Sequence, residues 1–180
     1  MYATASVICW RTDEGQTPMT TLAVTGHMDL TDEAVPLVRA ALDRVLADYE
    51  PTDLVGVSCI AKGSDSLFAE AVLAAGGRLT VVLPSRDYRE AKVKPEHAVA
   101  FDRLRAAASE EIVMPHETAH RTAYEAANAE LLRRADRLVA VWDGQPPSGK
   151  GGGTADTVQQ AQAVGLGVTV VWPEGAVRKG

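Results

Sequence analysis

The sequence predicts a three-layer α/β fold, in which helices cover both faces of a mostly parallel sheet of about six strands. Short apolar runs alternate with longer helical patterns over residues 22–172, and this alternation is typical of parallel crossover units. The apolar runs are nearly continuous, as expected of strands buried on both faces. At 180 residues the chain is long enough for one domain with a full core. We expect a single domain over 1–180, with 1–20 as an N-terminal strand and loop extension and 175–180 as a frayed tail.

The first half of the chain alternates three main strands with two helices. After a short strand at 4–10 and a polar loop, the expected strands are 22–26, 53–60 and 79–83, and the expected helices are 31–47 and 66–75. Apolar residues recur at helical spacing in the first helix. Pro36 fits this helix only in its first turn, where no N–H is needed, so Thr31 or Asp32 is the expected cap.

The second half continues the alternation. The expected strands are 111–114, 138–142 and 168–172, and the expected helices are 96–108, 118–134 and 155–164. Connections from helix to strand are short, whereas connections from strand to helix are longer and carry glycine and polar residues. The second set gathers at the carboxyl edge of a parallel sheet, where ligands bind. We therefore expect the functional site at that edge.

Composition and charge argue against several classes of partner. The formal net charge of −6 argues against nucleic acid and anionic membranes, which need a basic face. No apolar run approaches the roughly 20 residues of a membrane helix, and the N-terminus lacks the pattern of a secretory signal. We expect a cytoplasmic protein in which Cys9 and Cys59, both within apolar runs, are buried reduced thiols.

A glycine-rich loop at 143–154 joins the expected strand 138–142 to the expected helix 155–164. Glycines let the backbone come close to a ligand, and the first N–H groups of the helix point toward it. Thr154 can cap the helix or offer its hydroxyl. The pattern predicts a phosphate-bearing ligand, and the candidate contacts here are Asp143, Gly151, Gly152, Gly153 and Thr154.

The same loop has the spacing G-x-x-x-x-G-K of a magnesium P-loop at 144–150. Gly151 stands where a P-loop needs Ser or Thr to hold the metal. Pro146 and Pro147 also remove N–H donors from a loop that works by donating them. We therefore do not expect a P-loop.

A second motif, HETAH at 116–120, spells the zinc hydrolase pattern H-E-x-x-H. That chemistry needs His116 and His120 one helical turn apart, Glu117 as general base, and a third ligand. The motif straddles an expected helix start, and no obvious third ligand follows, although His27 could approach from a neighbouring loop. A zinc hydrolase is one alternative, and two solvated loop histidines are the other.

Other strand-to-helix loops supply further candidates, each with a structural alternative. Gly26 either forms a plain turn or lets the backbone approach a ligand. Asp65 either caps a helix or binds a sugar hydroxyl, and Asn128 binds either a ligand or a neighbouring backbone group. The full set of candidate contacts in these segments is Thr25, Gly26, His27, Lys62, Gly63, Ser64, Asp65, Pro84 and Asn128.

Taken in order, these motifs resemble the SLOG superfamily over about residues 22–172. The matching segments are Gly26 with the polar residue after it, AKGSDSLFAE at 61–70, VVLP at 81–84, Asn128 ahead of Ala135 and Asp136, and GGGTADT at 151–157. This Rossmann-like group contains the DprA/Smf proteins, the LOG cytokinin-activating phosphoribohydrolases and the molybdenum-cofactor carrier proteins. The resemblance implies a modified Rossmann fold, often dimeric, with a nucleotide or nucleotide-derived ligand at the glycine-rich edge.

The sequence departs from the LOG enzyme pattern P-G-G-x-G-T-x-x-E. With Thr154 aligned to the threonine, Gly149 takes the place of the proline, Lys150 that of the second glycine, and Thr157 that of the glutamate. Asp156 lies one residue early, which on a helix turns it about 100° away.

The missing glutamate matters because a carboxylate stabilises the positively charged transition state of glycosidic cleavage. Asp65, Glu117 and Asp156 are the candidate replacements, and Arg121 lies in the region of the family's catalytic arginine.

We therefore expect a protein that binds a nucleotide or nucleotide-derived small molecule and serves as a sensor or carrier. We expect it to form a homodimer, and we assign it no cofactor. The first alternative is a nucleoside 5′-monophosphate N-glycosidase with a relocated carboxylate. The second is the zinc hydrolase of 116–120.

Overall fold

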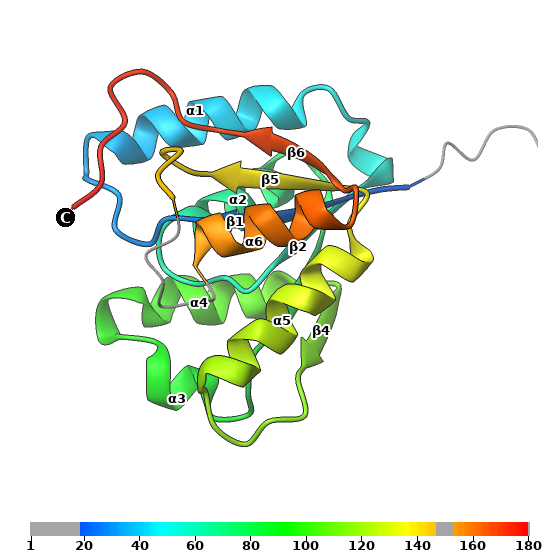
Figure 1. Cartoon of the computed structure of the whole chain (residues 1–180), viewed down its shortest axis with the longest axis vertical. Helices are drawn as coiled ribbons and strands as arrows, with labels where there is room; N and C mark the ends of the chain where they lie inside the picture. The colour runs from blue at the N-terminus through cyan, green and yellow to red at the C-terminus, as the bar shows by residue number, and fades with distance from the viewer. Residues whose placement is uncertain (1–18, 147–152, 180) are drawn as a thin grey trace, which may run out of the picture.

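The computed structural model describes residues 19–146 and 153–179 and confirms the three-layer α/β Rossmann-like fold (Figure 1). All strand pairings among these residues are parallel, in the order β4-β3-β2-β1-β5-β6. The strands are β1 (Thr20–Gly26), β2 (Leu54–Ser58), β3 (Arg78–Leu83), β4 (Glu110–Val113), β5 (Arg137–Val141) and β6 (Gly167–Val170). The helices are α1 (Ala34–Leu46), α2 (Ser64–Ala74), α3 (Tyr88–Lys92), α4 (Pro95–Ala107), α5 (Arg121–Arg134) and α6 (Thr154–Ala163).

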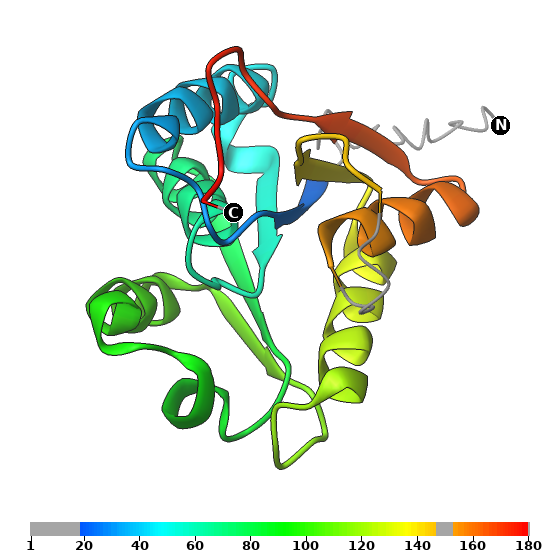
Figure 2. The same ribbon diagram turned by 60° about the vertical axis from the view of Figure 1, so that its left-hand side comes forward.

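Successive side chains of each strand point to opposite faces of the sheet, and each face has its own helices. Leu22 and Leu79 lie on the face covered by α1, α2 and α4. Ala23 and Leu138 lie on the face covered by α5 and α6. Figure 2 shows α5 and α6, in yellow and orange, across the sheet from α1 and α2. Burial on both faces explains why the strands are continuous apolar runs.

The order in which strands are added to the sheet reverses at β1. The chain first builds outward through β2, β3 and β4, and then returns to place β5 and β6 on the other side of β1. The helices after β1 and β5 therefore cover opposite faces, so their connections diverge. Such a switch point opens a crevice beyond the carboxyl ends of the two strands.

Several helix boundaries, among them the start of α2 at Ser64 rather than residue 66, and one helix differ from expectation. α5 begins at Arg121 rather than residue 118, and the short α3 was not predicted. α1 begins at Ala34, whose N–H donates to the backbone and side-chain oxygens of Thr31 at 3.0 and 3.3 Å. The cap position is Glu33 rather than the expected Thr31 or Asp32, although Thr31 still accepts from the first N–H group of the helix. Pro36 lies within the first turn as predicted.

The C-terminal segment is paired rather than frayed. Arg178 forms an antiparallel bridge with Leu30. The N–H of Thr31 donates to the carbonyl of Val177 at 3.0 Å, and the N–H of Lys179 donates to that of Asp29 at 2.6 Å. This pairing brings Arg178 to the carboxyl edge of the sheet.

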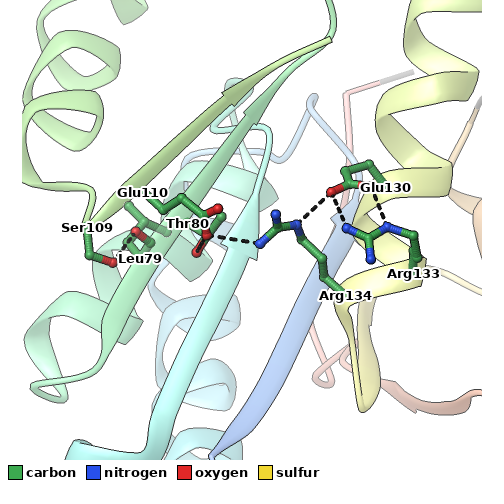
Figure 3. Close-up of polar contacts among 7 residues, drawn as sticks. All are labelled: Leu79, Thr80, Ser109, Glu110, Glu130, Arg133 and Arg134. Carbon is green, nitrogen blue, oxygen red and sulfur yellow. Dashed lines mark hydrogen bonds and ion pairs between the residues drawn. The ribbon is translucent and has the colours of Figure 1, made fainter.

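An ion-pair network fastens the end of α5 to the opposite, amino edge (Figure 3). Arg134 donates to Glu130 on its own helix at 2.6 Å and to Glu110 of β4 at 2.9 Å. Arg133 also donates to Glu130 at 2.7 Å. These ion pairs stabilise the packing of α5 against the sheet. Because they lie at the amino edge, they leave the carboxyl edge open.

Cys59 is buried directly after β2, while Cys9 lies outside the described residues. None of the helices that the structure describes is long and apolar enough to cross a lipid bilayer.

Candidate functional site

A cavity of about 820 Å³ opens at the carboxyl edge of the sheet, across the β1–β5 switch point. Its volume is within the range of about 300–1,000 Å³ that is usual for small-molecule sites. The predicted residues that the structure brings to its wall are Thr25, Gly26, His27, Asp65, Pro84, Asn128, Asp143, Gly153 and Thr154. The strand-to-helix loops therefore converge at one site, as their composition predicts.

The remaining predicted contacts lie elsewhere. Lys62 lines a smaller cavity next to the first, and Gly63 and Ser64 line neither. Gly151 and Gly152 lie outside the described residues, as does the rest of the P-loop-like segment from 147.

Gly63 and Ser64 have a packing role instead. Ser64 donates from its backbone N–H and its hydroxyl to the carbonyl of His27, at 3.1 and 2.7 Å. A Cβ on Gly26 would lie 2.5 Å from the Cβ of Ser64, and a Cβ on Gly63 would lie 2.7 Å from the carbonyl oxygen of Met28. The glycines let the end of β1 pack directly against the start of α2.

The N-terminus of α6 lines the cavity, and among the described residues no acceptor is found for its first N–H groups. The N–H groups of Thr154, Ala155 and Asp156 belong to the first turn, where a helix supplies no acceptor, and all three residues line the cavity. The cap is Gly153 rather than Thr154, and the N–H of Gly153 donates to Oδ2 of Asp156 at 3.0 Å. Asp156 is thus occupied in capping its own helix, which explains its position without a catalytic role.

A charged cluster spans the switch point. Nε2 of His27 lies 3.1 Å from Oδ1 of Asp143 and 3.3 Å from its backbone nitrogen. A protonated ring nitrogen donates to the carboxylate, whereas an unprotonated one accepts from the backbone N–H. Arg178 contacts the other carboxylate oxygen at 2.9 Å. The cluster therefore joins β1, β5 and the C-terminal segment.

The Asp143 carboxylate is held in its charged form. Burial alone would raise its pKa. Hydrogen bonds from the backbone of Gln145 and from His27 outweigh burial and, with the charge of Arg178, hold the pKa of Asp143 below its ordinary value. Arg178 was not among the predicted site residues, because nothing in the local sequence signals that the last residues pair with the segment after β1.

The carboxyl group of Asp65 has a raised pKa, in contrast to that of Asp143. Asp65 lies in the first turn of α2 at the cavity wall. Burial raises the pKa of its carboxyl to about 7, although an N–H from Ala61 acts in the other direction. Burial also raises the pKa of the Cys59 thiol and that of the Tyr88 hydroxyl, and the nearby Asp65 charge adds to both. Asp65 can therefore either donate or accept a proton near neutral pH, a property that is frequent at functional sites.

Aromatic and amide side chains form the wall toward α5. Tyr124 and Asn128 are four residues apart on α5, so they share one face of the helix, and both line the cavity. Trp142 lines it from the end of β5, and its indole N–H donates to the carbonyl of Gln145 at 3.0 Å. Flat aromatic rings and an amide offer a base both stacking surface and hydrogen bonds.

The zinc motif does not form a metal site. His120 is the cap of α5, and its Nδ1 accepts from the N–H of Ala123 at 3.4 Å. Glu117 is exposed and pairs with Arg86 at 3.1 Å. The motif precedes the helix that would align its two histidines, and nowhere in 19–146 or 153–179 do three His, Cys, Asp or Glu side chains gather to hold a metal.

Arg121 lies at the mouth of the cavity. Its guanidinium is exposed and pairs with Glu125 one turn along α5 at 2.7 Å. The hydrogen bond with Glu125 raises the pKa of Arg121, and the charge of Asp156 across the mouth contributes.

Comparison with solved structures finds the same fold in DNA processing proteins. DNA processing protein A (DprA) from Streptococcus pneumoniae matches with a TM-score of 0.63 and 17% identity, over 84% of this chain and 50% of that one. DprA from Helicobacter pylori matches with a TM-score of 0.61 and 15% identity, over 85% and 65%. The present chain thus spans between half and two thirds of these proteins.

The Moco carrier protein from Chlamydomonas reinhardtii also matches, with a TM-score of 0.54 and 19% identity, over 87% of this chain and 79% of that one. No protein-family model matches the chain, and no curated protein matches it. DprA and the cofactor carrier are two of the groups that the sequence resembles, so the likeness to the SLOG superfamily is confirmed at the level of fold.

One expectation is wrong. We expected nucleic acid to be an unlikely partner because the net charge is −6. The H. pylori protein with this fold binds single-stranded DNA. Net charge describes the whole surface, whereas binding depends on the charge of one face, so overall acidity does not exclude this class of ligand.

Proposed function

We propose that the protein binds a nucleotide or nucleotide-derived small molecule in the cavity at the β1–β5 switch point. The observation that carries the proposal is the first turn of α6, whose residues Gly153 to Asp156 line a cavity of about 820 Å³. Such a turn attracts a phosphate through both its free donors and the helix dipole.

The other walls suit the rest of a nucleotide. Tyr124 and Trp142 offer aromatic surface to a base, and Asn128 offers an amide. Asp65 lies where a sugar hydroxyl would find an acceptor. The use of this fold by a cofactor carrier supports a binding or carrier role. That the protein acts as a homodimer in the cytoplasm stays a prediction.

The test is thermal unfolding and titration calorimetry with a panel of nucleotides, on the wild type and on Gly153→Val. Gly153 has an extended backbone, with φ −84° and ψ 177°, and among the described residues an added Cβ would meet only Oδ2 of Asp156, at 3.5 Å. Valine is therefore tolerated by the fold but places two further methyl groups beside the first-turn donors.

We expect Gly153→Val to lose the nucleotide-induced rise in Tm, while its unliganded Tm falls by only a few degrees, in keeping with a cap change of about 1 kcal/mol. Gly153→Ala, which adds a single methyl, is the size control and should keep most of the rise. Wild-type binding by the valine variant would refute the assignment of α6.

A second function, N-glycosidase activity on nucleoside 5′-monophosphates, is favoured by one observation. Asp65 places a carboxyl group at the cavity wall, and its charged form, which prevails above a pKa of about 7, can replace the glutamate that the α6 segment lacks. Release of free base by the wild type, abolished in Asp65→Asn with binding retained, would establish it. Intact nucleotides after prolonged incubation would leave binding alone.

A further inference from the structure

A second cavity, of about 290 Å³, adjoins the first. It lies between the segment after β1, the loop before α2, the α3–α4 turn and the C-terminal segment. Its wall contains Lys62, Lys92, Lys94 and Lys179, and we call this cavity the lysine annex. The chain has one other lysine, Lys150, which lies outside the described residues.

The gathering of these lysines is a product of the fold. They come from three separate stretches of a sequence that otherwise uses arginine for its positive charges. Lysine presents a compact charge with rotatable donors, which suits a phosphate approached from several sides, whereas arginine suits flat, forked contacts. In a chain with a net charge of −6, a local group of four lysines creates a positive field that attracts anions.

Counter-charges neutralise the annex only in part. Lys62 pairs with Glu96 at 3.3 Å and Lys179 pairs with Asp32 at 3.1 Å, and every member of these pairs is more than half exposed. Exposed pairs of this kind are weak and are easily exchanged for a ligand. Asp29 also lines the wall.

Lys92 and Lys94 form no ion pair within the part of the chain that the structure describes, although a backbone hydrogen bond and, to a smaller extent, the charge of Lys94 contribute to lowering the pKa of the nearby Glu96. Among the described residues, no carboxylate lies within ion-pair distance of either ammonium group. Lys94 lines the annex alone, whereas Lys92 lines both cavities. The two side chains can therefore be tested separately.

The annex and the main cavity share a boundary. Met28, Ala61, Tyr88 and Lys92 line both. On the far wall of the annex, His97 is held by a hydrogen bond from Nε2 to the carbonyl of Ile60 at 3.0 Å. One ligand can thus extend from the main cavity into the annex, where a fixed wall and mobile lysine side chains would receive its end.

We propose that the lysine annex binds a second phosphate of the ligand whose first phosphate lies at the N-terminus of α6. This inference rests on the proposed function and narrows it. The ligand is then a nucleotide with two separated phosphates, of the dinucleotide class, rather than a nucleoside monophosphate.

The test is titration calorimetry with a nucleoside 5′-monophosphate and a 5′-phosphorylated dinucleotide. The variants are Lys94→Gln and the control Arg44→Gln, which removes an exposed charge in the last turn of α1, outside both cavities. We expect Lys94→Gln to weaken dinucleotide binding about fivefold to tenfold, as for one lost charge-assisted contact. Monophosphate binding should change by less than about twofold in both variants. Equal effects on both ligands, or none on either, would overturn the proposal.

A second measurement separates this proposal from the proposed function. If no nucleotide binds, the proposed function fails, and inorganic phosphate then becomes the probe of the annex. Saturable shifts of the His97 ring signals in NMR spectra, lost in a Lys92→Gln/Lys94→Gln variant, would retain the annex as an anion site. Unchanged His97 signals at high phosphate concentration would remove it as well.

Discussion

The carboxyl group of Asp65 makes the sharpest prediction, because it should weaken the fold at the pH at which it would serve the site. Burial raises its pKa from 3.8 to about 7 in the folded protein. Between these two values the folded state binds more protons than the unfolded state, so stability falls as pH rises from about 4 to about 7 and then levels off. Replacing Asp65 with asparagine removes this loss and keeps an oxygen to accept from Ala61.

The size of the effect follows from the pKa. The rise in the pKa of Asp65 from 3.8 to about 7 means that folding disfavours the charged form, relative to the neutral form, by roughly 4 kcal/mol. Asp65 lines an open cavity and lies in the first turn of α2, where water and the helix dipole stabilise its charge. We therefore expect Asp65→Asn to stabilise the protein at pH 8 by less, about 1–3 kcal/mol, which raises Tm by about 2–10 °C.

Thermal unfolding by circular dichroism at pH 8.0 and pH 4.5, at equal ionic strength, measures this gain. The control is Asp48→Asn, which changes an exposed aspartate after α1 and should leave Tm nearly unchanged at both pH values. The gain of Asp65→Asn should shrink at pH 4.5, because most of the stability loss develops between that pH and about 7. A lower Tm at pH 8 would show that the carboxylate is stabilised by its surroundings, and an equal gain at both pH values would show that the gain does not come from ionisation of Asp65.

Two further predictions concern the scaffold. Gly63→Ala should lower the free energy of unfolding in urea by about 3 kcal/mol, because Gly63 has φ +88° and an added Cβ would lie 2.7 Å from the Met28 carbonyl oxygen. Gly144→Ala, at φ +78° and with no described atom within 4 Å of the added Cβ, should lower it by only about 1 kcal/mol, and equal losses would contradict the packing argument. Glu130→Gln should lower it by about 1–2 kcal/mol at pH 7, because hydrogen bonds from Arg133, acting against partial burial, hold the pKa of Glu130 at about 2. That difference should shrink as pH falls from about 4.5 toward 2, and a difference independent of pH would exclude the ion pairs as its cause.

Much of the fold was predictable because its signals are local. The six main strands and five of the helices follow from apolar runs and helical spacing, since a strand between two helical layers must be apolar on both faces. The contrast between short and long connections predicts which edge carries the site. Asp65 and Asn128 could be predicted as cavity residues because each follows, or faces, a strand end at that edge.

The misses concern residues whose surroundings, near or distant in the chain, give them another role. HETAH at 116–120 spells a zinc motif, but α5 begins only after it, because His120 caps the helix instead of lying within it. Gly63 and Ser64 have the residue types of a ligand loop, yet they pack against the end of β1. In both cases the residue type is compatible with two roles, and only the surrounding chain selects one.

The sequence by itself therefore determined the layers, the order of the elements and the edge at which a ligand would bind, because periodicity and loop composition act over short stretches. Only the tertiary structure decided which side chains meet there. The C-terminal segment pairs with the chain after β1 and so brings Arg178 to Asp143. Four lysines from three stretches meet in the annex. Such meetings depend on how the strands are ordered in the sheet, and no local pattern encodes them.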